Sequence, residues 1–317
     1  MNLAEGGWPR PGGRLFARHW GQNKKTTMTT TFPETYTELP PQEQKPPGRQ
    51  EQMHPQPIEE DKHYVASGKL KGKVAVVTGG DSGIGRSVAI LFAREGADVC
   101  IVYLNEHEDA DKTMARIEAL GRRVIKFAGD IADPEFCGEV IQRTINAFGR
   151  IDILVNNAAE QDEVGGVEDL EPERVEKSFR TNIFGFFYLT KAALPHLKAG
   201  AAIINTTSIQ ACDPSPHLMV YACTKAAILN FTRSLAKQLA DKKIRVNAVA
   251  PGPVWTPLIP STFSANDIGS FGEKTLFKRP GQPAEVAPAF LFFATESESS
   301  LITGQVLHVN GGQGMHS

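Results

Sequence analysis

The stretch from Lys73 to Gly96 constrains the fold more than any other part of this 317-residue chain. A β-branched run, Lys73-Val-Ala-Val-Val-Thr78, leads directly into Gly79-Gly-Asp-Ser-Gly-Ile-Gly85, and an apolar helical pattern opens at about Arg86. In a strand, glycine-rich turn and helix of this kind, glycine lets the backbone approach a ligand closely, and the helix N-terminus presents unpaired N–H groups to a pyrophosphate. The pattern predicts a dinucleotide-binding α/β domain.

The composition is that of an ordinary globular protein, with 41% hydrophobic and 22% charged residues and a net charge of −2. The near-neutral balance argues against a nucleic-acid-binding surface, and no apolar run reaches the roughly 20 residues that a membrane span needs. Neither the four cysteines nor the histidines have spacing typical of metal ligands. We therefore expect a cytoplasmic protein with reduced thiols and no catalytic metal.

Residues 1–64 differ from the rest, since they hold nine of the 21 prolines and few aliphatic residues. Such a segment buries too little apolar surface to offset its ordering entropy, and we expect a largely disordered arm. Residues 1–27 carry five Arg or Lys against one acid, Glu5. They are either a targeting peptide or, as we prefer, an untranslated stretch preceding a start at Met28.

Residues 65–317 alternate between strand and helix patterns, which predicts a single Rossmann-type, doubly wound domain. Continuous apolar strands such as Val99–Val102 indicate a seven-stranded parallel sheet with helices on both faces. Expected strands are 73–78, 98–103, 122–128, 151–156, 201–206, 244–249 and 305–309. Expected helices are 86–96, 107–120, 134–148, 172–197, 217–241 and 284–294.

Tyr221 and Lys225 are four residues apart, so a helix would place them on one face, with Ser208 thirteen residues earlier. An ammonium beside a phenol favours the phenolate, and the phenol then becomes a proton donor and acceptor closer to neutral pH. The pair alone is weak evidence, because many helix surfaces carry a tyrosine and a lysine at this spacing.

The chain resembles the short-chain dehydrogenase/reductase family over nearly all of residues 70–312. The motifs that carry the resemblance occur in the family's order: Thr78-Gly-x-x-x-Gly83-Ile-Gly85, Asn156-Asn-Ala-Ala159, Asn182, Ser208, Tyr221-x-x-x-Lys225 and Pro251-Gly252. A closer likeness to general-stress proteins, glucose dehydrogenases and aldehyde reductases with a Pro/Gln-rich N-terminal extension is carried by Asn156–Gln161, Ser215–His217 and Trp255–Pro260.

The resemblance implies a role for each of four residues in hydride transfer between a nicotinamide cofactor and a CH–OH or C=O group. Tyr221 would be the general acid and base, and Lys225 would lower its pKa and hold the nicotinamide ribose. Ser208 would orient the substrate oxygen, and Asn182 would hold a water in a proton relay to solvent.

Cofactor contacts follow from the turn and from the family's pattern. The turn residues Gly79, Asp81, Ser82, Gly83, Ile84 and Gly85 would line the pyrophosphate. The adenosine would meet Tyr103, Asn105, Asp130, Ile131, Asn156, Asn157, Ala158 and Ala159, where Asp130 could alternatively cap the helix that follows. Tyr221, Lys225, Pro251, Gly252, Val254 and Thr256 would contact the nicotinamide half.

The choice between NAD and NADP stays open. An acid at the end of the second strand normally binds the ribose 2′-OH, and an Arg there accommodates a 2′-phosphate. That position is Tyr103, followed by Leu104 and Asn105, with no Arg beside it and several acids close behind. The missing acid slightly favours NADP over NAD, and these residues are also compatible with use of both cofactors.

We expect a mobile lid over residues 255–280 and candidate substrate contacts at Gln210, His217 and Trp255, although a Pro-flanked His more often faces solvent. By the family resemblance, apolar crowding on the helices of Asn182 and Tyr221 suggests a homotetramer. The predicted function is reduction of a small aldehyde or ketone, or oxidation of the corresponding alcohol or sugar. The alternatives are a catalytically silent dinucleotide-binding stress sensor and an epimerase or dehydratase on the same fold.

Overall fold

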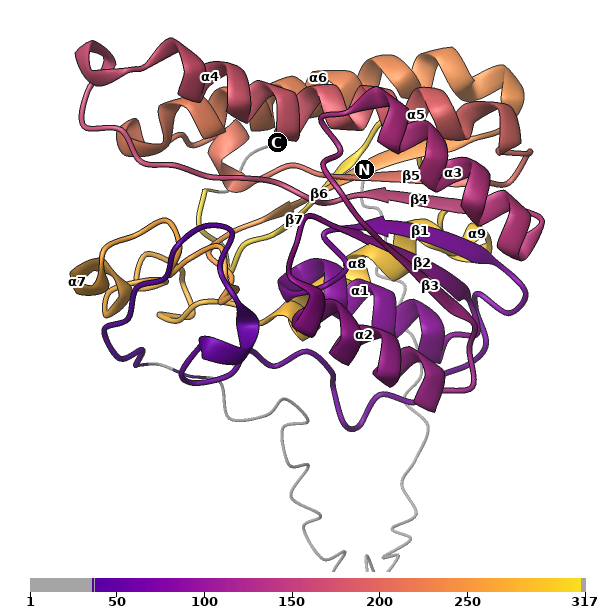
Figure 1. The fold of residues 1–317 in the computed structure, drawn as a ribbon, viewed down its shortest axis with the longest axis horizontal. Coiled ribbons are helices and arrows are strands. Elements are labelled where there is room, and N and C mark those ends of the chain that lie inside the picture. The colour runs from indigo at the N-terminus through magenta and orange to yellow at the C-terminus, as the bar shows by residue number, and fades with distance from the viewer. Residues whose placement is uncertain (1–35, 37, 315–317) are drawn as a thin grey trace, which may run out of the picture. The chain divides into compact units, whose positions relative to one another are not determined.

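The computed structural model describes residues 36 and 38–314, which belong to one compact unit (Figure 1). In this part of the chain seven strands form one parallel sheet in the order β3-β2-β1-β4-β5-β6-β7. The strands are β1 (Val74–Thr78), β2 (Asp98–Tyr103), β3 (Val124–Ala128), β4 (Ile153–Asn156), β5 (Ala202–Thr206), β6 (Arg245–Pro251) and β7 (Val306–Val309). The predicted seven-stranded doubly wound sheet is confirmed.

Helices cover both faces of the sheet (Figure 1). One layer holds α1 (Gly83–Arg94), α2 (His107–Ala119) and α8 (Pro283–Ala294), with the short α9 (Glu296–Ser299) beyond it. The other holds α3 (Pro134–Phe148), α4 (Pro172–Phe179), α5 (Gly185–Ala193) and α6 (Met219–Leu239). The short α7 (Ala265–Ile268) lies in the segment between β6 and α8.

The central strands are buried along their whole length because apolar residues face both helix layers. Every residue of β1, β2, β4, β5 and β6 is buried. Burial on both faces is what a parallel sheet requires, and it explains the unbroken apolar runs in the sequence. All seven carboxyl ends consequently lie at one edge of the sheet, where the loops that follow them gather.

The helix expected over residues 172–197 is interrupted. A π-helical turn at Arg180–Phe184 separates α4 from α5, and a 3₁₀ turn at Leu194–His196 ends the segment. Asn182, within the π turn, is completely buried and hydrogen-bonds outside its own helix, to the backbone of Glu160 and to Thr224. A π turn supplies the extra residue that lets one side chain leave the helical register.

The N-terminal segment differs from the expectation of disorder through residue 64. Residues 38–64 pack against the domain, and Leu39, Gln50 and Met53 are buried. Leu39 and Met53 join Trp255, Ile259 and Ile268 in an apolar cluster. Composition misled here because few apolar residues suffice when the domain itself supplies the partners. Residues 1–35, with the predicted start at Met28, lie outside the described part of the chain.

Candidate functional site

A cavity of about 1140 Å³ opens at the carboxyl edge of the sheet. It exceeds the roughly 300–1,000 Å³ of typical small-molecule pockets, so it has room for an extended ligand. The loops after the strands supply its lining, and the segments 46–48 and 257–274 close it from the side. The cavity therefore occupies the position where open parallel sheets bind nucleotides.

The glycine-rich turn forms one end of the cavity. Gly79 and Gly83 have φ of +62° and +53°, a region that favours glycine. A Cβ added to Gly85 would lie 1.9 Å from the Gly79 carbonyl oxygen, so this close approach excludes any side chain. The cavity is lined by Gly79, Asp81, Ser82, Gly83 and Ile84, whereas Gly85 lies behind them. This cradle fits a pyrophosphate at the start of α1.

Thr78, just before the turn, connects the ends of β1 and β4. Its hydroxyl accepts hydrogen bonds from the backbone N–H groups of Asn157 and Ala158, at 2.8 and 3.0 Å. The Asn157 amide donates back to the Thr78 carbonyl. Asn157, Ala158 and Ala159 line the cavity, while Asn156 is buried and bonds to Asn205 inside the sheet.

Tyr103, Asn105, Asp130 and Ile131 line the cavity near the ends of β2 and β3, as predicted. The Tyr103 hydroxyl lies 2.9 Å from His107 Nδ1, a partner that the sequence did not reveal. Asp130 accepts a hydrogen bond from the Ala132 N–H and closes a turn, whereas Asp133 caps α3. The alternative in which Asp130 caps that helix is therefore wrong.

Ser208, Tyr221 and Lys225 come together at the cavity wall. Lys225 Nζ lies 5.2 Å from the centre of the Tyr221 ring and donates to the Thr206 carbonyl at 3.0 Å. Ser208 follows β5 and begins the turn Ile209–Ala211, where its hydroxyl accepts from the Gln210 N–H at 3.2 Å. Helix α6 and strand β5 thus bring a phenol, an ammonium and a hydroxyl to one place.

Burial dominates the proton chemistry of this group. It raises the pKa of the Tyr221 phenol to about 12, and the neighbouring Ser208 hydroxyl partly opposes the shift. Burial also lowers the pKa of Lys225 to about 7, so part of its charge is lost near neutral pH. Burial, rather than the charge of Lys225, therefore dominates the pKa of the phenol in this structure, and the lowering of that pKa by Lys225 remains a prediction.

Asn182 lies behind this group and does not line the cavity. Its amide accepts from the Glu160 N–H and donates to the Glu160 carbonyl and the Thr224 hydroxyl. That hydroxyl in turn donates to the Tyr221 carbonyl at 2.7 Å. Asn182 thus connects the β4 loop to the helix of Tyr221, and its place in a water relay remains a prediction.

The predicted substrate contacts separate in the structure. Gln210 lines the cavity, and its side-chain oxygen accepts from the Ser215 N–H. His217 is exposed outside the cavity lining. Trp255 is fully buried, and its Nε1 donates to the Pro55 carbonyl at 2.8 Å, so it anchors the N-terminal segment. The nicotinamide candidates Pro251, Gly252, Val254 and Thr256 do line the cavity.

Sequence reasoning missed the contribution of the N-terminal segment to this cavity. Pro46, Pro47 and Gly48 line it, and Arg49 Nε lies 3.1 Å from Glu106 Oε2 at the loop after β2. No local pattern connects these residues with the turn, because they lie far upstream and only the fold brings them there. Among the described residues, no group of three His, Cys, Asp or Glu could hold a metal ion, and no helix is long and apolar enough to cross a membrane.

Comparisons with known proteins identify the family of the chain. A family model described as Enoyl-(Acyl carrier protein) reductase matches residues 79–314. General stress protein 39 of Bacillus subtilis is 50% identical over 87% of this chain and 96% of its own. NADPH-dependent aldehyde reductase 1 of Arabidopsis thaliana is 49% identical (84% and 94% covered), and glucose and ribitol dehydrogenase of Daucus carota is 49% identical (87% and 97%).

Solved structures of similar sequence have the same fold. A short-chain dehydrogenase from Burkholderia cenocepacia in complex with NADP is 35% identical, with a TM-score of 0.73 over 77% of this chain and 99% of that one. A 3-ketoacyl-(acyl-carrier-protein) reductase from Brucella melitensis complexed with NADH is 31% identical, with a TM-score of 0.71 over 78% and 100%. The chain belongs to the short-chain dehydrogenase/reductase family, as the motifs predicted. It is an NAD(P)-dependent oxidoreductase.

Substitution of Gly85 tests the cradle. Gly85→Ala places a methyl group 1.9 Å from the Gly79 carbonyl oxygen, so the turn must open, and we expect loss of most dinucleotide affinity in a fluorescence titration. The matched control is Gly138→Ala in α3, where nothing lies within 4 Å of the new Cβ. That change should raise the free energy of unfolding by about 0.5–1 kcal/mol and leave binding intact. Unchanged affinity in Gly85→Ala would contradict the assignment of the cradle.

Asp81 provides a test by pH. Burial raises its pKa from 3.8 to about 6, with Asp109 adding to the shift and Arg86 opposing it. The folded state therefore binds the proton more tightly than the unfolded state, so the carboxyl destabilises the fold increasingly as pH rises from about 4 to about 6 and by a constant amount above that. The stability of Asp81→Asn relative to the original protein should improve by about 2 kcal/mol between pH 4.5 and pH 8, measured by chemical denaturation. Asp241→Asn, at an exposed position, is the control; an equal trend in both variants would exclude this explanation.

Proposed function

We propose that the protein interconverts small aldehydes or ketones and the corresponding alcohols or sugars, using the cavity for both the nicotinamide cofactor and the substrate. The observation that supports this most directly is the meeting of Tyr221, Ser208 and Lys225 at the wall of a cavity whose far end is the glycine cradle. The dinucleotide, when bound, supplies or accepts the hydride, and the protein's residues place the carbonyl and move the proton.

In this proposal the phenol of Tyr221 donates its proton to the substrate oxygen during reduction and takes it back during oxidation. The Ser208 hydroxyl lies beside it and hydrogen-bonds the same oxygen, which fixes the orientation of the carbonyl. Lys225 and Asn182 act indirectly, through their effect on the position and charge of the groups that they contact.

The pKa values suggest how the tyrosine becomes active. Lys225 is buried and has no carboxylate among its recorded partners, so its charge is costly. Negative phosphates in the cavity would raise the pKa of Lys225 and restore its charge. The charged ammonium, 5.2 Å from the ring centre, would then favour the phenolate of Tyr221. Cofactor binding would thus prepare the proton donor.

The substrate end of the cavity suits a polar molecule. Its lining includes Glu160, Gln161, Asp162, Gln210 and Asp213, side chains that pair with hydroxyl groups, beside the apolar rings of Phe263 and Phe271. The aldehyde reductase and the glucose and ribitol dehydrogenase among the relatives support small carbonyl compounds and polyols as the substrate class.

We propose that both cofactors bind, with NADP slightly favoured. Arg49 brings a guanidinium to the loop after β2, the region where an Arg accommodates a 2′-phosphate. It is paired there with Glu51, Glu106 and Glu108, of which Glu106 lines the cavity and could accept from a 2′-hydroxyl. One family member was solved with NADP and another with NADH.

We further propose a cytoplasmic homotetramer. Phe187 is 51% exposed on α5 and stacks against Phe231 of α6, with ring centres 4.4 Å apart. Phe184 is also exposed. Together these phenylalanines leave an apolar area that a single subunit does not cover, which is typical of a contact between subunits.

Replacement of the phenol tests the mechanism. Tyr221→Phe should keep dinucleotide affinity within about twofold and lower kcat for aldehyde reduction by about 10²- to 10⁴-fold, since only the proton donor is removed. Tyr188→Phe, a tyrosine on α5, is the matched control. Lys225→Ala should impair both binding and turnover. A panel of aldehydes and polyols with NADPH and NADH measures these effects, and full activity in Tyr221→Phe would refute the proposal.

The assembly has its own test. Phe187→Asp should convert the tetramer into smaller species in size-exclusion chromatography with light scattering, because a charge then lies in the apolar contact. Val65→Asp, at an exposed apolar residue away from this helix pair, should leave the mass unchanged. A tetramer in both variants would show that α5 and α6 do not form the contact.

A further inference from the structure

We propose that the N-terminal segment Pro46–Glu59 is part of the dinucleotide site, and that Gln50 is the positioning residue that sets the glycine-rich turn. The proposal rests on the assignment of the cavity to a dinucleotide. It concerns residues that lie outside the family model's match at 79–314, so the family's motifs do not assign them a role.

Gln50 makes the direct contact between the segment and the turn. It is completely buried, and its side-chain oxygen accepts a hydrogen bond from the N–H of Gly83, the first residue of α1, at 2.7 Å. Its side-chain nitrogen donates to Glu59, and its backbone N–H donates to Asp109 on α2 at 2.7 Å. This bond fixes the position of Gly83 and occupies its N–H, so the segment supports the turn from behind while the other turn residues face the pyrophosphate. Ile84, the next residue, lines the cavity.

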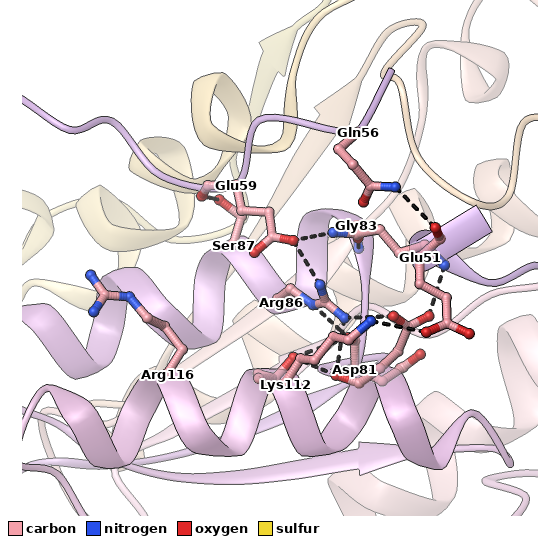
Figure 2. Close-up of polar contacts among 12 residues, drawn as sticks. Glu51, Gln56, Glu59, Asp81, Gly83, Arg86, Ser87, Lys112 and Arg116 are labelled. Carbon is pink, nitrogen blue, oxygen red and sulfur yellow. Dashed lines mark hydrogen bonds and ion pairs between the residues drawn. The ribbon is translucent and has the colours of Figure 1, made fainter. Parts of the chain in front are cut away.

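A charge network makes the segment part of the turn's support. Arg86, which is 4% exposed, bonds to Glu59 Oε1 at 2.7 Å, to Asp109 Oδ1 at 2.9 Å and to the carbonyl of Asp81 at 2.7 Å (Figure 2). The hydroxyl of Ser87 donates to the Glu59 carbonyl at 2.6 Å. Glu59 thus supplies one of the two carboxylates that compensate a buried guanidinium directly behind the cradle, and such a charge is costly when unpaired.

The same segment also holds residues 255–260, which approach the turn directly, since a Cβ on Gly83 would lie 3.1 Å from Thr256. The Pro55 carbonyl accepts from Trp255 Nε1, and just before the segment the Gln44 N–H donates to the Pro260 carbonyl at 2.7 Å. Gly48 packs so closely that a Cβ there would lie 2.5 Å from the Pro257 carbonyl oxygen. The segment is also bonded to helix α8, since the Ala284 N–H donates to the Ile58 carbonyl.

The glycine-rich turn and residues 255–260 are both bonded to the segment, and its residues Pro46, Pro47 and Gly48 line the cavity beside them. The segment therefore supports the pyrophosphate cradle and residues 255–260 together. Loss of the Gln50 acceptor should release the turn and weaken dinucleotide binding before it affects the chemistry at Tyr221.

Gln50→Met tests this, because methionine has nearly the same length and replaces the amide oxygen that binds the Gly83 N–H by a weakly accepting thioether. We expect the Kd of NADPH and of NADH to rise about tenfold, the KM of the cofactor to rise in parallel, and kcat at saturating cofactor to stay within twofold. The matched control is Gln56→Met. That glutamine is exposed and donates to the Glu51 and Met53 carbonyls within the segment, so affinity should not change.

The outcomes are distinguishable. Gln50→Met with the affinity of the original protein would overturn the proposal, and so would a loss of kcat without a change in Kd. Should Gln50→Met not fold by circular dichroism, Trp255→Phe decides: it removes the bond to Pro55 and should raise the Kd at least threefold, whereas no change would again overturn the proposal. If the original protein binds neither dinucleotide, the cofactor assignment itself fails, independently of Gln50.

Discussion

The close approach of the Gly79 carbonyl to Gly85 is the constraint on which the site depends. With 1.9 Å between that oxygen and any added Cβ, the chain turns from β1 directly into α1, and the start of the helix faces the cavity. The surrounding structure is built against this turn. Thr78 binds the loop after β4, and Thr256 lies 3.1 Å from the position of a Gly83 Cβ.

Burial gives the cavity its chemistry. The sheet and α6 remove Tyr221 and Lys225 from water, which raises the pKa of the phenol and lowers that of the amine. Asp81 at the other end is shifted in the direction that favours its neutral form. A group of buried, incompletely compensated charges is poised to respond to a charged ligand, because the ligand's own charge changes which protonation states are stable.

The N-terminal segment shows how composition can mislead. Its prolines and polar residues predict disorder for an isolated chain, yet Gln50, Met53 and Glu59 find their partners on α1, α2 and the segment 255–268. Trp255 was predicted to contact the substrate because an aromatic residue in the region 255–280 can face either the substrate or the protein interior. Only the position of Pro55 decides that it faces the protein.

The sequence by itself determined the sheet and the glycine-rich turn, because these depend on local periodicity and on glycine's backbone freedom. The spacing put Tyr221 and Lys225 on one face of a helix, and the family resemblance implied Ser208 beside them. The tertiary structure decided the π turn at Asn182, the pKa shifts and the place of residues 38–64. Each of these depends on contacts between residues distant in the chain and on removal from water, neither of which leaves a local pattern.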